Sequence, residues 1–245
     1  AKDAAQQLMS GTYSLNADYQ NIYNNDNLNN NKEVILYKRY EPTYLMHSLI
    51  AYLYSSTVIS GLTKSAVESY LCSDGKPIKL SASFQGDDDV NTVMANRDKR
   101  FLITVDSTYY YYKGHVKSGL TSSTGYRVTK FLPDSNKLKT IQTGIGTNIT
   151  DAPLFYISEV YLNYVEAAAE LDEMGQYTLT QPDLDNTINQ LRARGGVTAM
   201  TLAGHQDPGY TDSEKDADVT SLIWEIRRER RVELMLNGFR YQDLM

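Results

Sequence analysis

Charged side chains gather near the end of the sequence, where residues 227–233 read Arg-Arg-Glu-Arg-Arg-Val-Glu. Glu229 and Glu233 are four residues apart, so a helix would place both carboxylates on one face. Paired carboxylates can act as an acid and a base, as they do in glycosidases. Here the neighbouring arginines would lower both pKa values, which is wrong for a general acid. Two structural interpretations remain: a solvated charged face, or an internal ion-pair network that fixes this helix to others.

The remaining reactive side chains follow no known catalytic or metal-binding pattern. His47, His115 and His205 lie far apart, and none stands at a known spacing from a Cys, Ser or Asp. The sequence contains no nucleophile elbow, no H-E-x-x-H and no phosphate loop. Residues 87–89 are three consecutive aspartates, but they lack the alternating ligands and the later Gly and Glu of an EF-hand. We therefore predict that the protein is not an enzyme and that it holds no cofactor or metal ion.

The composition of the chain excludes several classes of partner and of structure. The 245 residues carry a formal net charge of −6, which argues against nucleic acid, because phosphate binding favours a basic surface. Cys72 is the single cysteine of the sequence, so no intramolecular disulfide can form. No apolar run approaches the roughly 18 residues of a membrane-spanning helix, and no signal-peptide pattern is present. Expected helices are interrupted at both ends, so we expect a fragment of a longer protein.

The second part of the chain, residues 151–245, is expected to be helical. Apolar side chains recur there every three or four residues, which predicts an amphipathic helix over residues 151–175. Thr150 or Asp151 is its expected N-cap. A run of three alanines offers a small-residue face, which suits close packing against a neighbouring helix of a tetratricopeptide-like hairpin.

Two further helices are expected to complete this part. The first covers residues 182–194, with Thr180 as N-cap in an acidic variant of the capping box. The other runs through the charged block, from an N-cap at Asp218 or Thr220 to a stop at Gly238. It supplies a third packing partner for the hairpin.

The first part of the chain, residues 1–150, is expected to be rich in loops and tyrosine. The whole sequence has 20 tyrosines against five phenylalanines and one tryptophan. Tyrosine combines a flat apolar ring with a hydroxyl group that tolerates water, so it suits both half-buried strands and surfaces that stack on sugars. We predict short strands over residues 33–40, 101–105 and 126–131, a short helix over residues 64–70, and an opening helix over residues 1–11.

Seven segments of the chain resemble, in order, motifs of the SusD/RagB family of surface lipoproteins. They are NKEVIL (31–36), VESYLCSDGKPI (67–78), NRDKRF (96–101), GYRVTK (125–130), PLFYISEVYLNYVEA (153–167), NQLRARGG (189–196) and ERRVELMLNGFRYQDL (229–244). They cover nearly the whole chain, which is therefore similar to the C-terminal two-thirds of such a protein. Tyr156 and Asn237 depart from the motifs, which usually have arginine and glutamate there. If these positions normally pair, we expect Tyr156 and Asn237 to be in contact, since two neutral residues leave no unpaired buried charge.

The resemblance implies a mainly α fold, with tetratricopeptide-like helical hairpins and a loop-rich part that carries a few short β-strands. It implies one incomplete SusD-like domain over residues 1–245, in which 1–150 form the loop-rich part and 151–245 the helical scaffold. It further implies a protein of the outer-membrane cell surface, held through a lipid anchor outside this chain. Such proteins bind glycans without catalysis and deliver them to a TonB-dependent transporter of the SusC type. The alternative is a helical-repeat module that docks the transporter and has no sugar site in this fragment.

The charged residues of these motifs are interpreted as structural rather than as ligand contacts. We expect Glu229 or Glu233 to pair with Arg192 or Arg194 of the preceding helix, which favours the internal network over the solvated face. Trp224 is likewise expected to be a core residue. The other motif residues interpreted in this way are Arg97, Arg100, Arg230 and Arg240.

Ligand contacts are predicted from the chemistry of sugars. Aromatic planes stack on the C–H faces of sugar rings, while amides and arginines bind the hydroxyl groups. The tyrosines of the loop-rich part are therefore the candidate ligand-binding residues, and Asn24, Asn25 and Asn29 are candidate polar contacts. The candidate tyrosines are Tyr40, Tyr44, Tyr52 and Tyr54 first, followed by Tyr109 and Tyr111 with their neighbours Tyr110 and Tyr112.

Overall fold

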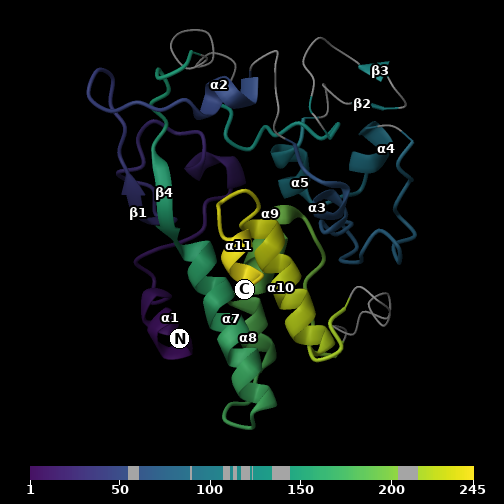
Figure 1. Ribbon diagram of the computed structural model, residues 1–245. Helices are drawn as coiled ribbons and strands as arrows, with labels where there is room; N and C mark the ends of the chain where they lie inside the picture. The colour runs from purple at the N-terminus through teal and green to yellow at the C-terminus, as the bar shows by residue number, and fades with distance from the viewer. Residues whose placement is uncertain are drawn as a thin grey trace.

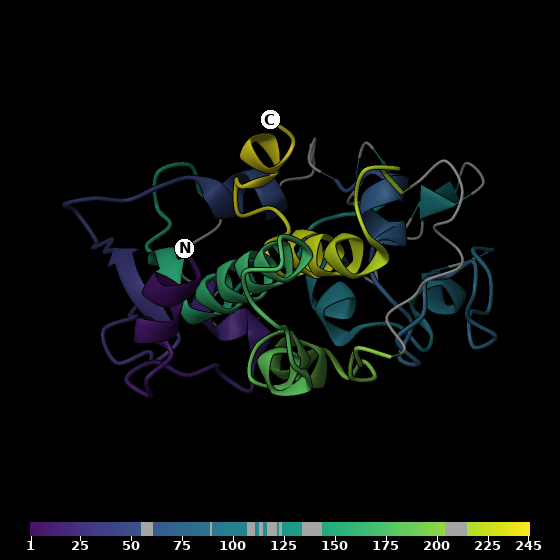
Figure 2. The same cartoon turned by 90° about the horizontal axis from the view of Figure 1, so that it is seen from below.

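The computed structural model describes residues 1–54, 61–88, 90–106, 111–112, 115–116, 122, 124–133, 144–203 and 215–245. Four helices form the frame in Figure 1: α7 (Ile157–Glu173), α8 (Gln181–Asp185), α9 (Ile188–Gly195) and α10 (Ser221–Glu233). Figures 1 and 2 both show α1 (Lys2–Leu8) on one side of α7 and α10 on the other. The frame is the predicted helical hairpin with a third helix packed against it.

Local sequence signals define several ends of these helices. Thr180 and Asp183 form the predicted capping box at the start of α8. The expected single helix over residues 182–194 is divided at Thr187 into α8 and α9. Gly196 follows α9 in the left-handed conformation, with a φ of 65°. Thr220 is the N-cap of α10, where its hydroxyl group accepts a hydrogen bond from the N–H of Ile223 at 3.4 Å.

The start of the long helix α7 differs from the prediction. Residues 152–156 form strand β4 (Ala152–Tyr156), which pairs antiparallel with β1 (Val34–Lys38), and α7 begins only at Ile157. The expected N-caps Thr150 and Asp151 therefore cap no helix. Apolar residues in a short run fit a strand as well as a helix, and the pairing with β1 decides between them.

The loop-rich part carries short elements, including the predicted helix α3 (Lys64–Glu68). The strand expected over residues 101–105 is instead helix α5 (Lys99–Thr104), which Asp98 caps by accepting the N–H of Arg100 at 2.8 Å. The strand expected over residues 126–131 is reduced to one bridge between Val105 and Val128. The other elements are the 3₁₀ helix η1 (Tyr19–Ile22), α2 (Leu49–Tyr54), α4 (Val90–Met94), β2 (Tyr111–Tyr112), β3 (His115–Val116) and α11 (Arg240–Asp243).

A buried ion-pair network joins α10 to α9 and to α5. The guanidinium group of Arg100 lies 2.5 Å from Glu229 and 2.8 Å from Glu233, and all three side chains are buried. From α9, Arg192 reaches Glu229 at 3.1 Å and Arg194 pairs with Glu233. The prediction of an internal network is confirmed, and the alternative of a solvated face is wrong.

The network sets the protonation of its members. Burial would raise the pKa of the Glu233 carboxyl, but Arg194 and Arg100 hold that pKa below its usual value. Burial would likewise lower the pKa of Arg100, yet the carboxylates of Asp98, Glu229 and Glu233 raise it. Arg100 and Glu233 are therefore charged at neutral pH, and each compensates the other inside the core.

Among the described residues, none of the helices has the length and the apolar character that crossing a membrane requires.

Candidate functional site

The candidate site starts at Tyr40, two residues beyond the end of β1. The N–H of Tyr40 donates to Asp151 Oδ1 at 2.8 Å, while Asp151 Oδ2 accepts the N–H of Leu28 at 3.0 Å. The half-buried ring of Tyr40 lies edge-on to the ring of His47, with 4.5 Å between the ring centres. Lys38 Nζ lies 5.4 Å from the centre of the same ring, a cation–π distance. The ring is therefore held on two sides, and only part of it is open to a ligand.

Tyr44 stands at the far end of a tight turn made by residues 41–44. The N–H of Tyr44 donates to the carbonyl of Glu41 at 3.3 Å, and Glu41 and Leu45 form an antiparallel bridge that closes the loop. Pro42 restricts its own φ to about −65°, and Thr43 has a φ of 67°, which together define a type II turn. The turn leaves the Tyr44 side chain 86% exposed.

Thr43 gives this turn a strained backbone. A β-branched residue at positive φ is uncommon, since glycine or asparagine fits that position of a type II turn better. Strain of this kind costs on the order of 1–3 kcal/mol and is concentrated at binding and catalytic sites. Asn96 and Leu236 also have positive φ, so the strain at Thr43 does not by itself assign a function to the turn.

His47 fastens this loop to the segment of residues 144–150. His47 and Asn148 form an antiparallel bridge, with N–H···O distances of 2.9 and 3.0 Å. The ring bonds on both sides, because Nδ1 accepts the N–H of Leu49 at 3.3 Å and Nε2 lies 2.9 Å from the carbonyl of Thr150. These partners require a proton on Nε2 only. Burial lowers the pKa of His47, so the ring is neutral at pH 7.

Helix α2 presents the next tyrosine of the loop. Ile50 and Leu53 are buried on its inner face, while Tyr52 on the outer face is 57% exposed. The Ser48 hydroxyl group accepts the N–H of Gly146 at 2.9 Å, so the start of α2 is also tied to residues 144–150. Tyr54 is the last residue of α2, and its side chain lies outside the described part of the structure.

The second group of predicted tyrosines is less completely described. Tyr111 belongs to β2, where it pairs with Val116 of β3, and the side chains of this hairpin are not described. Tyr109 lies outside the described residues, as does Tyr110. Figure 1 shows β2 and β3 at the same upper end of the molecule as α2. Tyr40, Tyr44 and Tyr52 belong to one continuous segment of the chain, which we name the tyrosine loop (residues 39–54).

Two of the predicted asparagine contacts bind the protein's own backbone through their side chains. Asn24 donates from its side-chain amide to the carbonyl of Leu132 at 3.5 Å, and Asn25 Oδ1 accepts the N–H of Asn27 at 3.1 Å. Asn29 is exposed.

Two residues near the candidate sites were missed or misjudged from the sequence. His47 braces the tyrosine loop, although nothing in its sequence neighbourhood points to its partners at residues 148 and 150. Trp224, expected in the core, is half-buried and lines a pocket beside α10. The four-residue spacing of Trp224 and Arg228 was the available signal, because such residues share a helix face.

The chemistry of the tyrosine loop suits a sugar. Tyr44 and Tyr52 expose flat aromatic faces next to their hydroxyl groups, which fits the alternating apolar and polar faces of a sugar ring. Arg39 and Glu41 form an exposed ion pair at 2.6 Å between β1 and the turn, close in sequence to Tyr44. No cluster of metal-ligating side chains occurs among the described residues.

Comparison with known proteins identifies relatives over almost the entire chain. The model of the SusD family matches residues 18–245. A SusD-like carbohydrate-binding protein from Bacteroides fragilis is 24% identical, with a TM-score of 0.68 over 99% of this chain and 47% of its own. A SusD superfamily protein from Parabacteroides distasonis is 17% identical, with a TM-score of 0.57 over 99% of this chain and 45% of its own.

A third structure widens the comparison to a protein described as a surface glycan-binding protein. Surface glycan-binding protein A from Bacteroides uniformis is 18% identical, with a TM-score of 0.53 over 99% of this chain and 43% of its own. No curated protein matches the chain. The chain spans less than half the length of the three solved structures, so the comparison covers the fold of this part.

Proposed function

Because this chain belongs to the SusD family, we propose that it binds oligo- or polysaccharides at the cell surface without transforming them. The observation that carries the proposal is the tyrosine loop. Tyr44 and Tyr52 are exposed on a segment that is anchored at Asp151, His47 and Ser48 rather than left free. An aromatic platform that is already rigid loses little conformational entropy when it binds.

Two matched structures support the choice of ligand. One is described as a carbohydrate-binding protein and another as a surface glycan-binding protein. In our proposal, residues 1–150 supply the ligand contacts and residues 151–245 the frame that supports them. The charged residues of the buried network stabilise the frame, so in our proposal they do not contact the glycan. The exposed tyrosines contact it instead.

The same proposal includes a role for the protein in glycan uptake across the outer membrane. It would act at the outer membrane, attached through a lipid anchor, and pass its glycan to a TonB-dependent transporter of the SusC type. A helical module that only docks the transporter is the competing function. Binding of free glycan in solution distinguishes the two, because only the first requires it.

The test is a binding panel of plant, fungal and host polysaccharides, measured by affinity electrophoresis and then by calorimetry. We expect retardation by at least one polysaccharide and no release of reducing ends during incubation. Absence of binding to every polysaccharide would refute the glycan-binding function and favour the docking module. Release of reducing ends would refute the non-catalytic assignment.

A further inference from the structure

A second candidate site is a pocket between α1 and the hairpin of α7, α8 and α9, which we name the α1 pocket. Its volume is about 610 Å³, which is within the range of small-molecule sites. Gln6 lines it from α1, Tyr161 from α7 and Asn186 from the end of α8. Figure 1 places α1 and α8 toward the lower end of the molecule and α2 at the upper end. The α1 pocket is therefore separate from the tyrosine loop.

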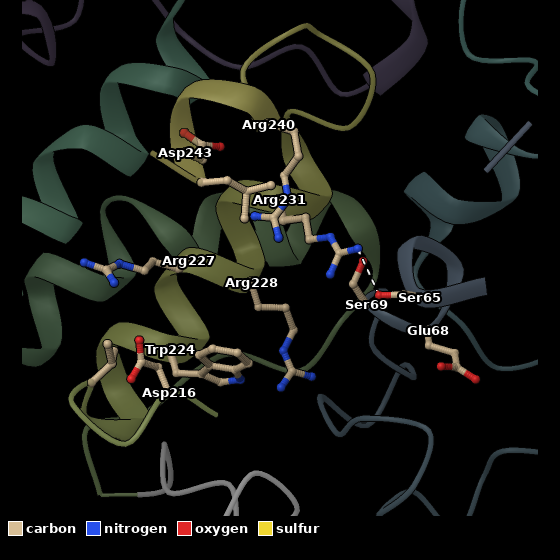
Figure 3. Close-up of a pocket in the computed structure, with 12 residues that line it drawn as sticks. Ser65, Glu68, Ser69, Asp216, Trp224, Arg227, Arg228, Arg231, Arg240 and Asp243 are labelled. Carbon is tan, nitrogen blue, oxygen red and sulfur yellow. Dashed lines mark hydrogen bonds between the residues drawn. The ribbon is translucent and has the colours of Figure 1, made fainter. Parts of the chain in front are cut away.

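The pocket beside α10 is of a different kind (Figure 3). Its wall carries charges of both signs, with the arginines of α10 and α11 alongside Glu68, Asp216 and Asp243. Opposite charges on one wall compensate each other, so that pocket indicates no particular class of ligand. Among the described residues that line the α1 pocket, by contrast, Asp183 is the single charged side chain.

Asp183 has no acceptor capacity left for a ligand. Its Oδ1 accepts the hydroxyl groups of Tyr164 at 2.8 Å and Tyr177 at 3.0 Å, and its Oδ2 accepts the N–H of Thr180 at 2.8 Å and the hydroxyl group of the same residue at 2.7 Å. A carboxylate has about four lone-pair sites, so these bonds use all of them. Burial would raise the pKa of Asp183, but the hydrogen bonds from Thr180 and the two tyrosines hold that pKa below its usual value. The α1 pocket therefore offers no free carboxylate to a cationic ligand.

The same bonds fix what the two tyrosines offer to a ligand. A hydroxyl group has one proton to donate and two lone pairs to accept with. Tyr164 and Tyr177 donate their protons to Asp183, so toward the pocket their oxygens can only accept. Lys2 Nζ lies 4.5 Å from the centre of the Tyr177 ring and 5.5 Å from that of Tyr164, which are cation–π distances. The rings are thus fixed before a ligand binds, and their oxygens require hydrogen-bond donors from it.

The other polar groups of the wall can bind such a ligand as well. Gln6 and Asn186 are exposed, and neither side-chain amide has a hydrogen-bond partner among the described residues. The half-buried Tyr161 likewise has no described partner for its hydroxyl group. Gln190 donates to the carbonyl of Asp185 at 2.8 Å, which leaves its side-chain oxygen as an acceptor. The wall therefore combines oxygens that only accept with amides that both donate and accept.

Apolar surface completes the α1 pocket. Met9 and Pro182 line it together with Tyr161. The Tyr161 ring packs against two of the hydrophobic cores, so its position is fixed. Apolar side chains and aromatic rings pack against C–H surface. The ligand that fits this wall is uncharged, carries several hydroxyl groups and has an apolar C–H face.

We propose that the α1 pocket binds a neutral sugar unit of a glycan. Its hydroxyl groups donate to the oxygens of Tyr164, Tyr177 and Gln190, and its C–H face lies against the apolar part of the wall. The inference rests on the proposed function in taking the ligand to be a saccharide. It adds contacts on the helical frame itself, beyond those of the tyrosine loop.

The test uses the Y44A/Y52A variant, so that the exposed rings of the tyrosine loop do not contribute to binding. We expect at least one of three neutral tetrasaccharides, cellotetraose, maltotetraose and mannotetraose, to bind in calorimetry. The fully O-methylated form of the tightest binder has no hydroxyl donors, and it should bind at least about tenfold more weakly. A galacturonic acid tetrasaccharide should also bind at least about tenfold more weakly, because its carboxylates meet no cation in the wall. Equal binding of the methylated or the acidic form, or no binding of any neutral probe, would overturn the proposal.

Further variants locate the binding on the protein. In the same background, Q6A/N186A should weaken binding of the neutral tetrasaccharide about tenfold or more. Q7A is the matched control, since Gln7 is the exposed neighbour of Gln6 on α1 and is not part of the pocket wall. All three side chains are exposed, so the melting temperature should not change. Unchanged affinity in Q6A/N186A, or an equal loss in Q7A, would contradict the site.

Nuclear magnetic resonance provides a measurement that needs no change in the pocket. On addition of the neutral tetrasaccharide, the side-chain amide resonances of Gln6, Asn186 and Gln190 should shift, while those of Gln7 should not. Shifts confined to residues outside the α1 pocket would refute the site.

The same samples separate this inference from the proposed function. Polysaccharide binding that Y44A/Y52A weakens, together with tetrasaccharide binding that Q6A/N186A weakens, supports both sites. Glycan binding by the unaltered protein without any effect on the α1 pocket refutes the pocket and leaves the proposed function intact. Absence of binding to every glycan by the unaltered protein refutes both.

Discussion

The side-chain amide of Asn237 donates a hydrogen bond to the hydroxyl group of Tyr156 at the start of α7. The same amide binds the hydroxyl group of Tyr23 at 3.0 Å, and Asn237 Oδ1 accepts from Lys130 Nζ at 2.9 Å. The expected contact between Tyr156 and Asn237 is confirmed. Where the family motifs usually have arginine and glutamate, this chain has two neutral groups that satisfy each other.

The first prediction concerns this contact. Y156F removes one hydroxyl group while Asn237 keeps its bond to Tyr23, so the unfolding free energy should fall by about 0.5–1.5 kcal/mol. N237L also leaves the buried Lys130 amine without one of its two hydrogen-bond acceptors, and a loss of about 2–4 kcal/mol is expected. Urea denaturation measures both values. Equal losses in the two variants would show that the Lys130 bond contributes nothing.

The second prediction tests the buried network. R100M removes the cation that contacts Asp98, Glu229 and Glu233, and leaves their buried carboxylates undercompensated. A loss of about 3–5 kcal/mol in unfolding free energy is expected. R227M is the control, because that arginine forms exposed ion pairs and should cost about 0–1 kcal/mol. Chemical denaturation measures the unfolding free energy of both variants. A small loss of unfolding free energy in R100M would mean that the network is not a major source of stability.

The third prediction concerns glycan binding by the tyrosine loop. Y44A and Y52A each remove an exposed ring, so the melting temperature should stay unchanged while glycan affinity falls about tenfold or more, as for an interface hot spot. Calorimetry with the polysaccharide that binds best in the panel measures the effect. The control is Y241A, which removes a 74% exposed tyrosine on α11, away from the loop. Unchanged affinity in both loop variants would refute the site but not the function.

The fourth prediction is a pH dependence at His47. Burial lowers the pKa of its ring, so the unfolded chain takes up a proton at higher pH than the folded one. The stability that His47 contributes is therefore fully present above its ordinary pKa of about 6.5 and is lost as pH falls through the lower, folded value. Protonation removes the acceptor for the Leu49 N–H, so amide exchange at the start of α2 should accelerate in acid, even after correction for intrinsic rates.

Nuclear magnetic resonance checks that prediction directly. The imidazole resonances of His47 should titrate below about 6.5, and H47Q should abolish the acid-dependent exchange at Leu49. A titration midpoint above that value would show that the folded structure does not lower the pKa of His47.

The fifth prediction concerns the strained turn. T43G removes the side chain that conflicts with a φ of 67°, at the cost of a more flexible unfolded chain. We expect a net gain of about 0.5–1 kcal/mol in unfolding free energy with Tyr44 still presented. Thermal denaturation measures the gain, and a crystal structure of the variant would show the turn. A loss of stability would mean that the Thr43 side chain supports the turn.

The helical frame could be predicted from sequence because its signals are local. The capping box of Thr180 and Asp183, the N-cap of Thr220 and the stripe of α7 each act within a few residues. The pairing of Glu229 and Glu233 with the arginines of α9 was predicted from two signals together: the two arginines at the end of the preceding helix, and the resemblance of both segments to scaffold motifs.

The errors arise where a distant partner decides the local structure. Residues 152–156 look like the first turn of a helix, but hydrogen bonding to β1 makes them a strand. Residues 101–105 are rich in strand-forming side chains, yet α5 is selected because it brings Arg100 to the carboxylates of α10. The tyrosines of residues 39–54 were identifiable by type, whereas their anchors at residues 144–151 have no signal near them in the sequence.

The pairing of β1 with β4 also has a kinetic consequence. Residues 39–151, which contain the tyrosine loop, lie between the two strands, so the sheet is a long-range contact that forms slowly compared with the helices. During synthesis, β1 cannot pair until β4 has left the ribosome. The tyrosine loop gains its contacts with residues 144–151 at the same step. Since the entropy of closing a loop grows only slowly with length, insertions between the strands would cost little stability. The segment that we propose to recognise the ligand can therefore lengthen in evolution while the helices that carry it stay the same.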